Sequence, residues 1–128
     1  MEMNQPTANR NVQNALPESS TDLQECIRIC MDGYRVCTET MLHCLSMGGK
    51  HADADHIRTM MNCAQICLTS AQLMMTGSQQ HMEVCGLCAT ACDNCAKSCA
   101  TIGEGDPKME ECVEVCKRCA ESCRKMSH

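Results

Sequence analysis

Residues 85–99 read Cys85-Gly86-Leu87-Cys88-Ala89-Thr90-Ala91-Cys92-Asp93-Asn94-Cys95-Ala96-Lys97-Ser98-Cys99. The five cysteines of this stretch follow one another at steps of 3, 4, 3 and 4 residues. Steps of three and four keep side chains on one face of an α-helix. The stretch therefore predicts a helix with one face made entirely of thiols.

Three other segments repeat this spacing and predict three more helices with a sulfur-rich face. In the segment 109–126, Met109 and Met126 extend the stripe by three residues at either end. In the segment 26–44, the stripe positions without a cysteine fall at or near Gly33 and Met41. The stripes are Cys26, Cys30, Cys37 and Cys44; His56, Met60, Cys63, Cys67, Ser70 and Met74; and Met109, Cys112, Cys116, Cys119, Cys123 and Met126.

Glycines, prolines and capping residues place the helix ends. Thr21 and Gln24 have capping-box spacing, so the first helix is expected to run from Thr21 to about Met47, before Gly48-Gly49. The second is expected from about residues 51–53 to Thr76, the third from a cap at Ser78 to Gly103, and the fourth from Asp106-Pro107 to about Met126.

Links of only a few residues make neighbouring helices antiparallel. The sequence thus predicts an all-α, up-down-up-down four-helix bundle with a cysteine-lined core. Residues 1–20, which are polar and hold Pro6 and Pro17, are expected to form a flexible N-terminal tail, and residues 21–128 the four-helix bundle domain.

The composition requires sulfur in the core. Among 128 residues, the chain has 15 Cys and 12 Met but no Phe or Trp, and Leu, Ile and Val together number 17. That share is below the roughly 20% under which composition indicates disorder, but that rule also requires a high net charge, and the net charge here is only −5. Cysteine and methionine behave as apolar side chains when buried, so they are expected to fill the interior.

The same composition narrows the class of function. An odd number of cysteines excludes a fully paired set of intrachain disulfides, and a large set of reduced thiols indicates metal binding in the cytoplasm. The first residues lack the features of a secretory signal. A net charge of −5 and the absence of a long apolar run predict neither a nucleic-acid nor a membrane partner, and no catalytic motif indicates an enzyme.

Thiolate and thioether ligands favour Cu(I), whereas zinc prefers closed sets of four ligands. Side chains three or four residues apart on a helix lie roughly 5–6 Å apart, close enough to flank one ion. Protonated thiols are neutral, so a metal-free core is expected to stay folded and to take up roughly one Cu(I) per thiolate. The predicted ligands are the cysteines of the four stripes, namely Cys26, Cys30, Cys37, Cys44, Cys63, Cys67, Cys85, Cys88, Cys92, Cys95, Cys99, Cys112, Cys116, Cys119 and Cys123, together with Met41, His56, Met60 and Met109.

The segments 26–30, 85–99 and 112–123, with their Cys-x2-Cys and Cys-x3-Cys pairs, resemble the bacterial copper storage proteins over about residues 22–126. The resemblance implies multiple Cu(I) ions bound by cysteine pairs inside the bundle, no catalysis, and commonly a homotetramer. It also implies a cytoplasmic location and a copper chaperone or cuproenzyme as a possible partner. The second helix is poorer in thiols, so the column is expected to be less uniform near Cys63 and Cys67.

Three alternatives remain open at this level. A zinc or mixed-metal thiolate buffer would use the same cysteines. An iron-sulfur electron carrier would use Cys85, Cys88, Cys92 and Cys95, although a regular helix places these along a line and not around a cluster. A thiol-redox buffer or disulfide-linked bundle is the third.

Methionine and histidine gather near both predicted ends of the bundle. The end that holds His56 and Met60 on the inward stripe is the favoured point for copper to enter. His43, His51, His81 and His128 lie off the stripe or in loops and are expected to be solvated at the surface.

Overall fold

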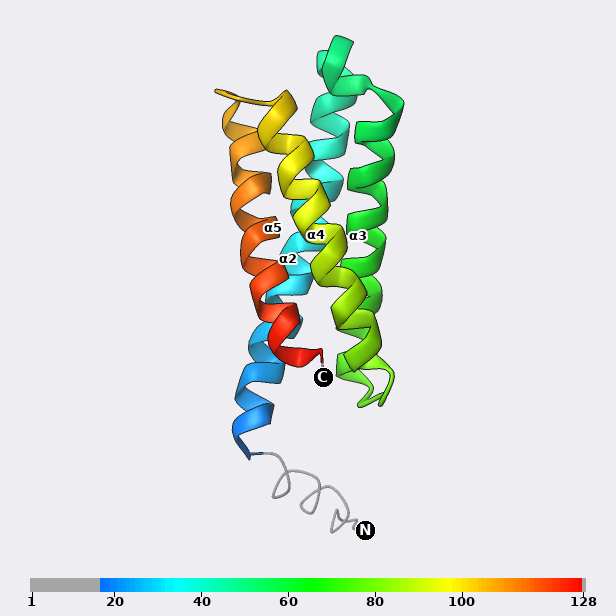
Figure 1. Cartoon of the computed structure of the whole chain (residues 1–128), viewed down its shortest axis with the longest axis vertical. Coiled ribbons are helices and arrows are strands. Elements are labelled where there is room, and N and C mark those ends of the chain that lie inside the picture. The colour runs from blue at the N-terminus through cyan, green and yellow to red at the C-terminus, as the bar shows by residue number, and fades with distance from the viewer. Residues whose placement is uncertain (1–16, 128) are drawn as a thin grey trace, which may run out of the picture.

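The computed structural model describes residues 17–127 and consists of four long helices in an antiparallel bundle (Figure 1). They are α2 (Pro17–Met47), α3 (Ala54–Met75), α4 (His81–Ile102) and α5 (Pro107–Met126), with a short 3-10 helix, η1 (Gly49–Ala52), between α2 and α3. No strand occurs within residues 17–127. The predicted all-α, up-down-up-down fold is confirmed, and the predictions for residues 1–16 and His128 fall outside the described residues.

Each helix packs against two neighbours around a common axis. α2 lies beside α3 and α5, and α4 lies beside the same two helices, so α2 and α4 face each other diagonally (Figure 1). This square arrangement aims one face of every helix at the centre, as the four sulfur stripes require.

The start of α5 is where the sequence predicted it. Asp106 precedes the helix and Pro107 is its first residue. One carboxylate oxygen of Asp106 accepts hydrogen bonds from the backbone N–H groups of Lys108 and Met109, which have no partner inside the helix. The turn before α5 passes through Gly105 at φ 84°, a conformation that glycine adopts without steric cost.

Two predicted helix starts are wrong. α2 begins at Pro17, so Thr21 lies inside the helix instead of capping it. Proline at a first helical position costs no hydrogen bond, because that N–H would be unpaired anyway. Ser78 does not cap α4, which begins three residues later at His81; its hydroxyl accepts from the N–H of Gln80 and closes a turn ahead of the helix.

The core consists mainly of sulfur. All fifteen cysteines are fully buried, and the large side chains buried with them include Met60, Met74 and Met109. In α2 the stripe position between Cys37 and Cys44 holds Thr40, which is fully buried, while Met41 is only partly buried at the edge of the core. Sequence spacing allowed either residue, because 40 and 41 are both three or four residues from each flanking cysteine.

Candidate metal centre: a column of thiols on the bundle axis

The cysteines of the four helices meet at the bundle axis. In the middle of the bundle, the Sγ atom of Cys37 on α2 lies 3.7 Å from that of Cys63 on α3 and 3.9 Å from that of Cys95 on α4. It lies 3.6 Å from Cys116 Sγ and 3.9 Å from Cys112 Sγ on α5. All four helices therefore contribute a thiol to one layer.

A second layer follows towards the end of the bundle where α4 begins. Cys67 Sγ on α3 lies 3.7 Å from the sulfurs of Cys88 and Cys92 on α4 and 3.8 Å from Cys119 Sγ on α5. Cys63 Sγ is 3.6 Å from Cys92 Sγ and joins this layer to the first. The column is continuous here although α3 has only two cysteines, because thiols of α4 and α5 close around them; the predicted thinning near Cys63 and Cys67 is wrong.

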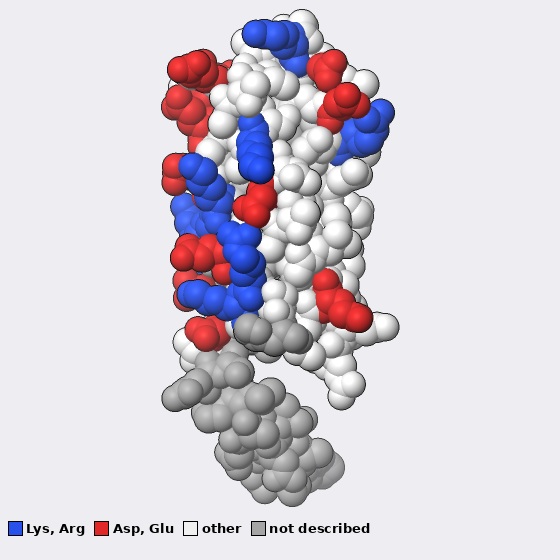
Figure 2. All heavy atoms as spheres, viewed as in Figure 1, with Lys and Arg blue, Asp and Glu red and all other residues white. Residues whose placement is uncertain are grey.

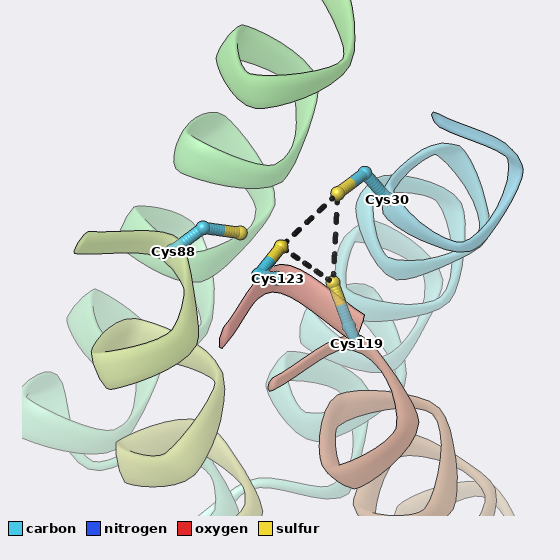
Figure 3. Close-up of side chains that lie close together, drawn as sticks. All are labelled: Cys30, Cys88, Cys119 and Cys123. Atoms are coloured by element: carbon cyan, nitrogen blue, oxygen red, sulfur yellow. Dashed lines mark hydrogen bonds between the residues drawn. The ribbon is translucent and has the colours of Figure 1, made fainter. Parts of the chain in front are cut away.

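A third layer contains Cys30, Cys88, Cys119 and Cys123, whose sulfurs point towards one another from three helices (Figure 3). Cys30 Sγ on α2 lies 3.5 Å from Cys123 Sγ and 3.8 Å from Cys119 Sγ on α5. Cys119 and Cys123, one turn apart on α5, are 4.0 Å apart. Thiols thus pair both along a helix and between helices.

Across the described residues, the sulfurs form five groups whose members all lie within 4.8 Å of one another. Several cysteines belong to two groups, so the groups overlap along the axis. The groups are Cys26, Cys85 and Cys123; Cys30, Cys88, Cys119 and Cys123; Cys67, Cys88, Cys92 and Cys119; Cys37, Cys63, Cys95 and Cys116; and Cys95, Cys99 and Cys112.

This arrangement argues against a disulfide-linked bundle and against an iron-sulfur electron carrier. All fifteen thiols are free. The contacts between cysteine sulfurs in the column span 3.5 to 4.0 Å, far longer than the S–S bond of a disulfide, about 2.05 Å. The four cysteines of the iron-sulfur alternative are divided between different groups: Cys85 meets α2 and α5 at one end, whereas Cys95 belongs to the middle layer. They do not surround a single point as a cluster would need.

Gly33 occupies a stripe position of α2 and leaves space for thiols of two other helices. A Cβ atom at this position would lie 2.9 Å from Cys67 Sγ and 3.7 Å from Cys119 Sγ. Real Cβ atoms essentially never approach sulfur as closely as the first of these contacts. The missing side chain therefore allows the sulfurs of α3 and α5 to approach the backbone of α2.

The column ends in a mixed set of ligands where α2 ends and α5 begins. The Cys44 thiol donates to Met109 Sδ at 3.2 Å, and its sulfur is 3.4 Å from His56 Nε2. The other ring nitrogen of His56, Nδ1, is 2.6 Å from Ser98 Oγ. When Nδ1–H donates to this hydroxyl, Nε2 keeps a free lone pair on the side of the Cys44 sulfur, where it can bind a metal ion. Burial lowers the pKa of His56, which keeps the imidazole neutral and able to bind metal.

Ser98 was not predicted as a site residue, because it lies beside Cys99 in the sequence, off the inward stripe. His43 and His51 were expected to be solvated, and this is wrong in part: both are partly buried, and their Nε2 atoms lie 2.7 and 3.8 Å from Asp106 Oδ2. Neither contacts the thiols of the column. The hydrogen bond from His43 lowers the pKa of Asp106, so this carboxylate stays ionised.

Burial and neighbouring thiols raise the pKa of ten of the fifteen cysteines. Hydrogen bonds from neighbouring thiols lower the pKa of the other five, which are Cys26, Cys63, Cys88, Cys112 and Cys119. Burial, together with the charge of Asp106, raises the pKa of Cys44 to about 11. The adjacent thiol of Cys112 raises the pKa of Cys116 to about 11. A row of bare thiolates at these distances would repel strongly, so the metal-free column holds its protons and is electrically neutral.

Comparisons with known proteins agree with this geometry. A family model described as copper storage protein (Csp) matches residues 19–128. A crystallised protein from Nitrosospira multiformis is 51% identical, with a TM-score of 0.79 over 84% of this chain and 96% of that one. No curated protein matches the chain.

Two copper storage proteins are also similar in structure. Cu(I)-bound BsCsp3 is 32% identical, with a TM-score of 0.77 over 84% of this chain and 99% of that one. Apo-Csp3 (copper storage protein 3) from Bacillus subtilis is 31% identical, with a TM-score of 0.66 over 82% and 98% of the two chains. Within residues 17–127, no helix combines the length and apolar character needed to cross a bilayer.

Proposed function

The chain belongs to the copper storage protein family, and from this premise we propose that its cysteine column is the store, with each thiolate binding Cu(I) inside the bundle. One observation carries the proposal: overlapping groups of three or four buried sulfurs follow one another along the axis. Because neighbouring sulfurs along most of the column lie within 4.0 Å of one another, successive Cu(I) ions can be bridged by thiolates without a change of fold.

The thiolate ligands are the fifteen cysteines of the column. Four other side chains are proposed as ligands or neighbours of the outermost ions. His56 and Met109 contact Cys44, Met60 is fully buried on the stripe of α3, and Met41 packs against the core from α2. A thioether binds Cu(I) more weakly than a thiolate, so the outermost ions are expected to be held less tightly than those in the middle of the column. In a copper-loaded crystal, an ion at Cys44 is expected to be bonded to His56 Nε2 and Met109 Sδ.

Binding replaces protons by metal. A neutral thiol gives its proton to water, and the thiolate that results binds one positive charge, so the column stays close to neutral at every stage of loading. This charge balance sets the capacity at roughly one Cu(I) for each of the fifteen thiolates. The same neutrality lets the empty bundle keep its fold, as a store that fills and empties requires.

Residues 21–128 form the copper-binding unit in this proposal, and residues 17–20, predicted as part of the tail, are the first turn of α2. The protein acts as a store and has no catalytic role. A reducing cytoplasm suits it, because fifteen free thiols persist only where disulfides do not form readily. Its partners are copper ions and the chaperone or cuproenzyme that exchanges them.

A titration tests the proposed metal. Under anaerobic conditions, with a chromogenic Cu(I) chelator as competitor, the reduced protein is expected to bind about fifteen tight equivalents of Cu(I) per chain. Zinc is expected to saturate at far fewer equivalents. Each zinc ion needs four ligands of its own, so fifteen thiols can form only a few complete zinc sites. Cys119→Ser should lower the number of tight Cu(I) equivalents, while Ser122→Ala, one turn away on α5, should not. Zinc binding that equals or exceeds copper binding would contradict the proposal.

The proposed homotetramer has a suitable surface over α3 and α4. Figure 2 shows this face largely free of charged side chains along the middle of the bundle. A groove there is lined by Ile66, Leu87, Ala91 and four polar uncharged residues, and Leu87 is 57% exposed. A second copy would remove this apolar surface from water.

A substitution checks the interface. Leu87→Glu is expected to reduce the mass in solution from that of a tetramer to that of a smaller species, because a carboxylate in an apolar interface loses its hydration. Lys117→Glu on the charged face of α5 is the control and should leave the mass unchanged. Light scattering on copper-free protein measures both, and an unaltered tetramer in Leu87→Glu would place the interface elsewhere.

A further inference from the structure

We propose that Cu(I) enters and leaves the column through the side of the bundle, along a groove between α4 and α5 that ends at Cys99. This proposal rests on the proposed storage function and assigns the route of that copper. The groove has a volume of about 400 Å³. Its lining residues are Cys99, Ala100, Gly103, Glu104, Glu110, Val113 and Glu114.

Cys99 connects this groove to the store. It is fully buried, and its sulfur forms a group within 4.8 Å with those of Cys95 and Cys112. Cys95 also belongs to the middle layer with Cys37, Cys63 and Cys116. An ion that reaches Cys99 is therefore one transfer away from the centre of the column.

At this end of the bundle, the ligands on the axis are covered by other side chains and, unlike Cys99, do not line the groove. Cys44 and Met109 are fully buried and His56 is 2% exposed, so the last three ligands of the column are covered. Met109 lies so close to Gly103 that a Cβ atom at residue 103 would collide with its side chain. Gly103 thus lets Met109 close the end of the column and at the same time forms part of the groove wall beside it.

The rim of the groove attracts cations. Glu104, Glu110 and Glu114 line it and are exposed, and the lining includes no Lys or Arg. Acidic side chains gather where α4 ends and α5 begins (Figure 2). A cleft with walls of one charge raises the local concentration of ions of the opposite charge. Ala100, Gly103 and Val113 are small or apolar and line the groove beside Cys99, so only small side chains separate these carboxylates from its thiol.

The transfer is a ligand exchange without a change of oxidation state. Cu(I) arrives bound to the donor atom of a small carrier. The Cys99 thiol releases its proton to water, its sulfur bonds to Cu(I), and the bond from copper to the carrier breaks, so the carrier leaves with its electron pair. Cys95 and Cys112 then take over the ion by the same exchange, and Cys99 is free for the next one.

Thiol labelling tests the route without copper. Reduced, metal-free protein is treated with less than one equivalent of N-ethylmaleimide, and the labelled cysteines are identified by peptide mass spectrometry. Cys99 is expected to react first, at least roughly tenfold faster than Cys44 and Cys26 near the two ends of the column, because access limits the reaction of buried thiols. Faster labelling of either end cysteine overturns the proposal.

A blocked groove gives the second test. Ala100→Trp places a large side chain in the groove, and Thr101→Trp places the same side chain on the next, exposed residue of α4 as a control. Stopped-flow absorption at the thiolate-to-copper charge-transfer band follows uptake from tetrakis(acetonitrile)copper(I). Ala100→Trp is expected to slow both uptake and Cys99 labelling by about tenfold, and Thr101→Trp to match the unmodified chain. Equal rates in the two variants overturn the route.

The effect of the negatively charged rim on copper uptake is tested separately. Glu104→Gln, Glu110→Gln and Glu114→Gln together are expected to slow uptake of the cationic copper complex several-fold at low ionic strength and to have no effect at high ionic strength. The control carries the same change at three exposed glutamates elsewhere, Glu25, Glu83 and Glu121. If both triple variants slow equally, the rim has no special role and the proposal is wrong in this respect. Copper bound at equilibrium is measured in parallel, so a failure of storage itself is distinguished from a failure of the route.

Discussion

Copper-free protein is expected to show the circular dichroism of a helical bundle, and copper is expected to raise its free energy of unfolding by at least about 4 kcal/mol when free Cu(I) exceeds the dissociation constant a thousandfold. The metal-free fold persists because protonated thiols fill the core as apolar side chains, with every cysteine fully buried. Copper then adds stability because it binds thiolates that only the folded bundle brings together. Denaturant unfolding with and without Cu(I), under anaerobic conditions, measures the difference.

Proton release provides the control for this prediction. The pKa of Cys44 and that of Cys116 are both raised to about 11, so these thiols carry protons at neutral pH. Loading in weakly buffered solution is expected to release about one proton per Cu(I). An unfolded copper-free chain would contradict the neutral core, and copper binding without proton release would contradict the thiol chemistry.

Substitution of Gly33 is expected to have the second large effect. Gly33→Leu should destabilise the bundle by about 3 kcal/mol and displace the thiols of Cys67 and Cys119, because extra carbon atoms in a filled core force their neighbours to move. Fewer tight Cu(I) equivalents should result, since these two cysteines share one of the thiol groups. Thermal unfolding and the chelator titration measure the two consequences.

Gly33→Ala tests whether the contact with Cys67 is the cause, because the contact and the helix propensity of alanine change the free energy of unfolding in opposite directions. In a helix, Gly→Ala alone stabilises by up to about 1 kcal/mol. Gly33→Ala should nevertheless destabilise, because its Cβ would lie 2.9 Å from Cys67 Sγ. Gly86→Ala in α4 is the matched control and should stabilise, since its nearest neighbour would be Ser127 Cβ at 3.4 Å. If Gly33→Ala stabilised the protein, the sulfur of Cys67 would not limit the space at residue 33, and this explanation would be wrong.

The sequence alone predicted the four helices and their inward faces, because steps of three and four residues leave a cysteine little choice of direction on a helix. The six stripe positions predicted in α3, from His56 to Met74, are all buried. Helix starts were less predictable. Thr21 and Ser78 have the side chains of capping residues, but α2 already begins at Pro17, and Ser78 closes a turn ahead of α4.

Contacts between helices were beyond the sequence. Spacing could place Gly33 on the stripe of α2, but only the packed bundle shows that Cys67 approaches it from α3. The pairing of His56 with Ser98, 42 residues away, depends on how α3 and α4 are rotated against each other. Likewise, the choice of Thr40 over Met41 as the buried residue follows from the rotation of α2, because both residues satisfy the spacing.

One measurement tests the central claim most directly: anomalous scattering at the copper edge from a crystal of the fully loaded protein. We expect a row of copper ions along the axis enclosed by α2, α3, α4 and α5, with each ion bonded to cysteine sulfurs and many ions bonded to sulfurs of two different helices. Copper confined to the outer surface, with the fifteen thiols unbound or joined in disulfides, would contradict it.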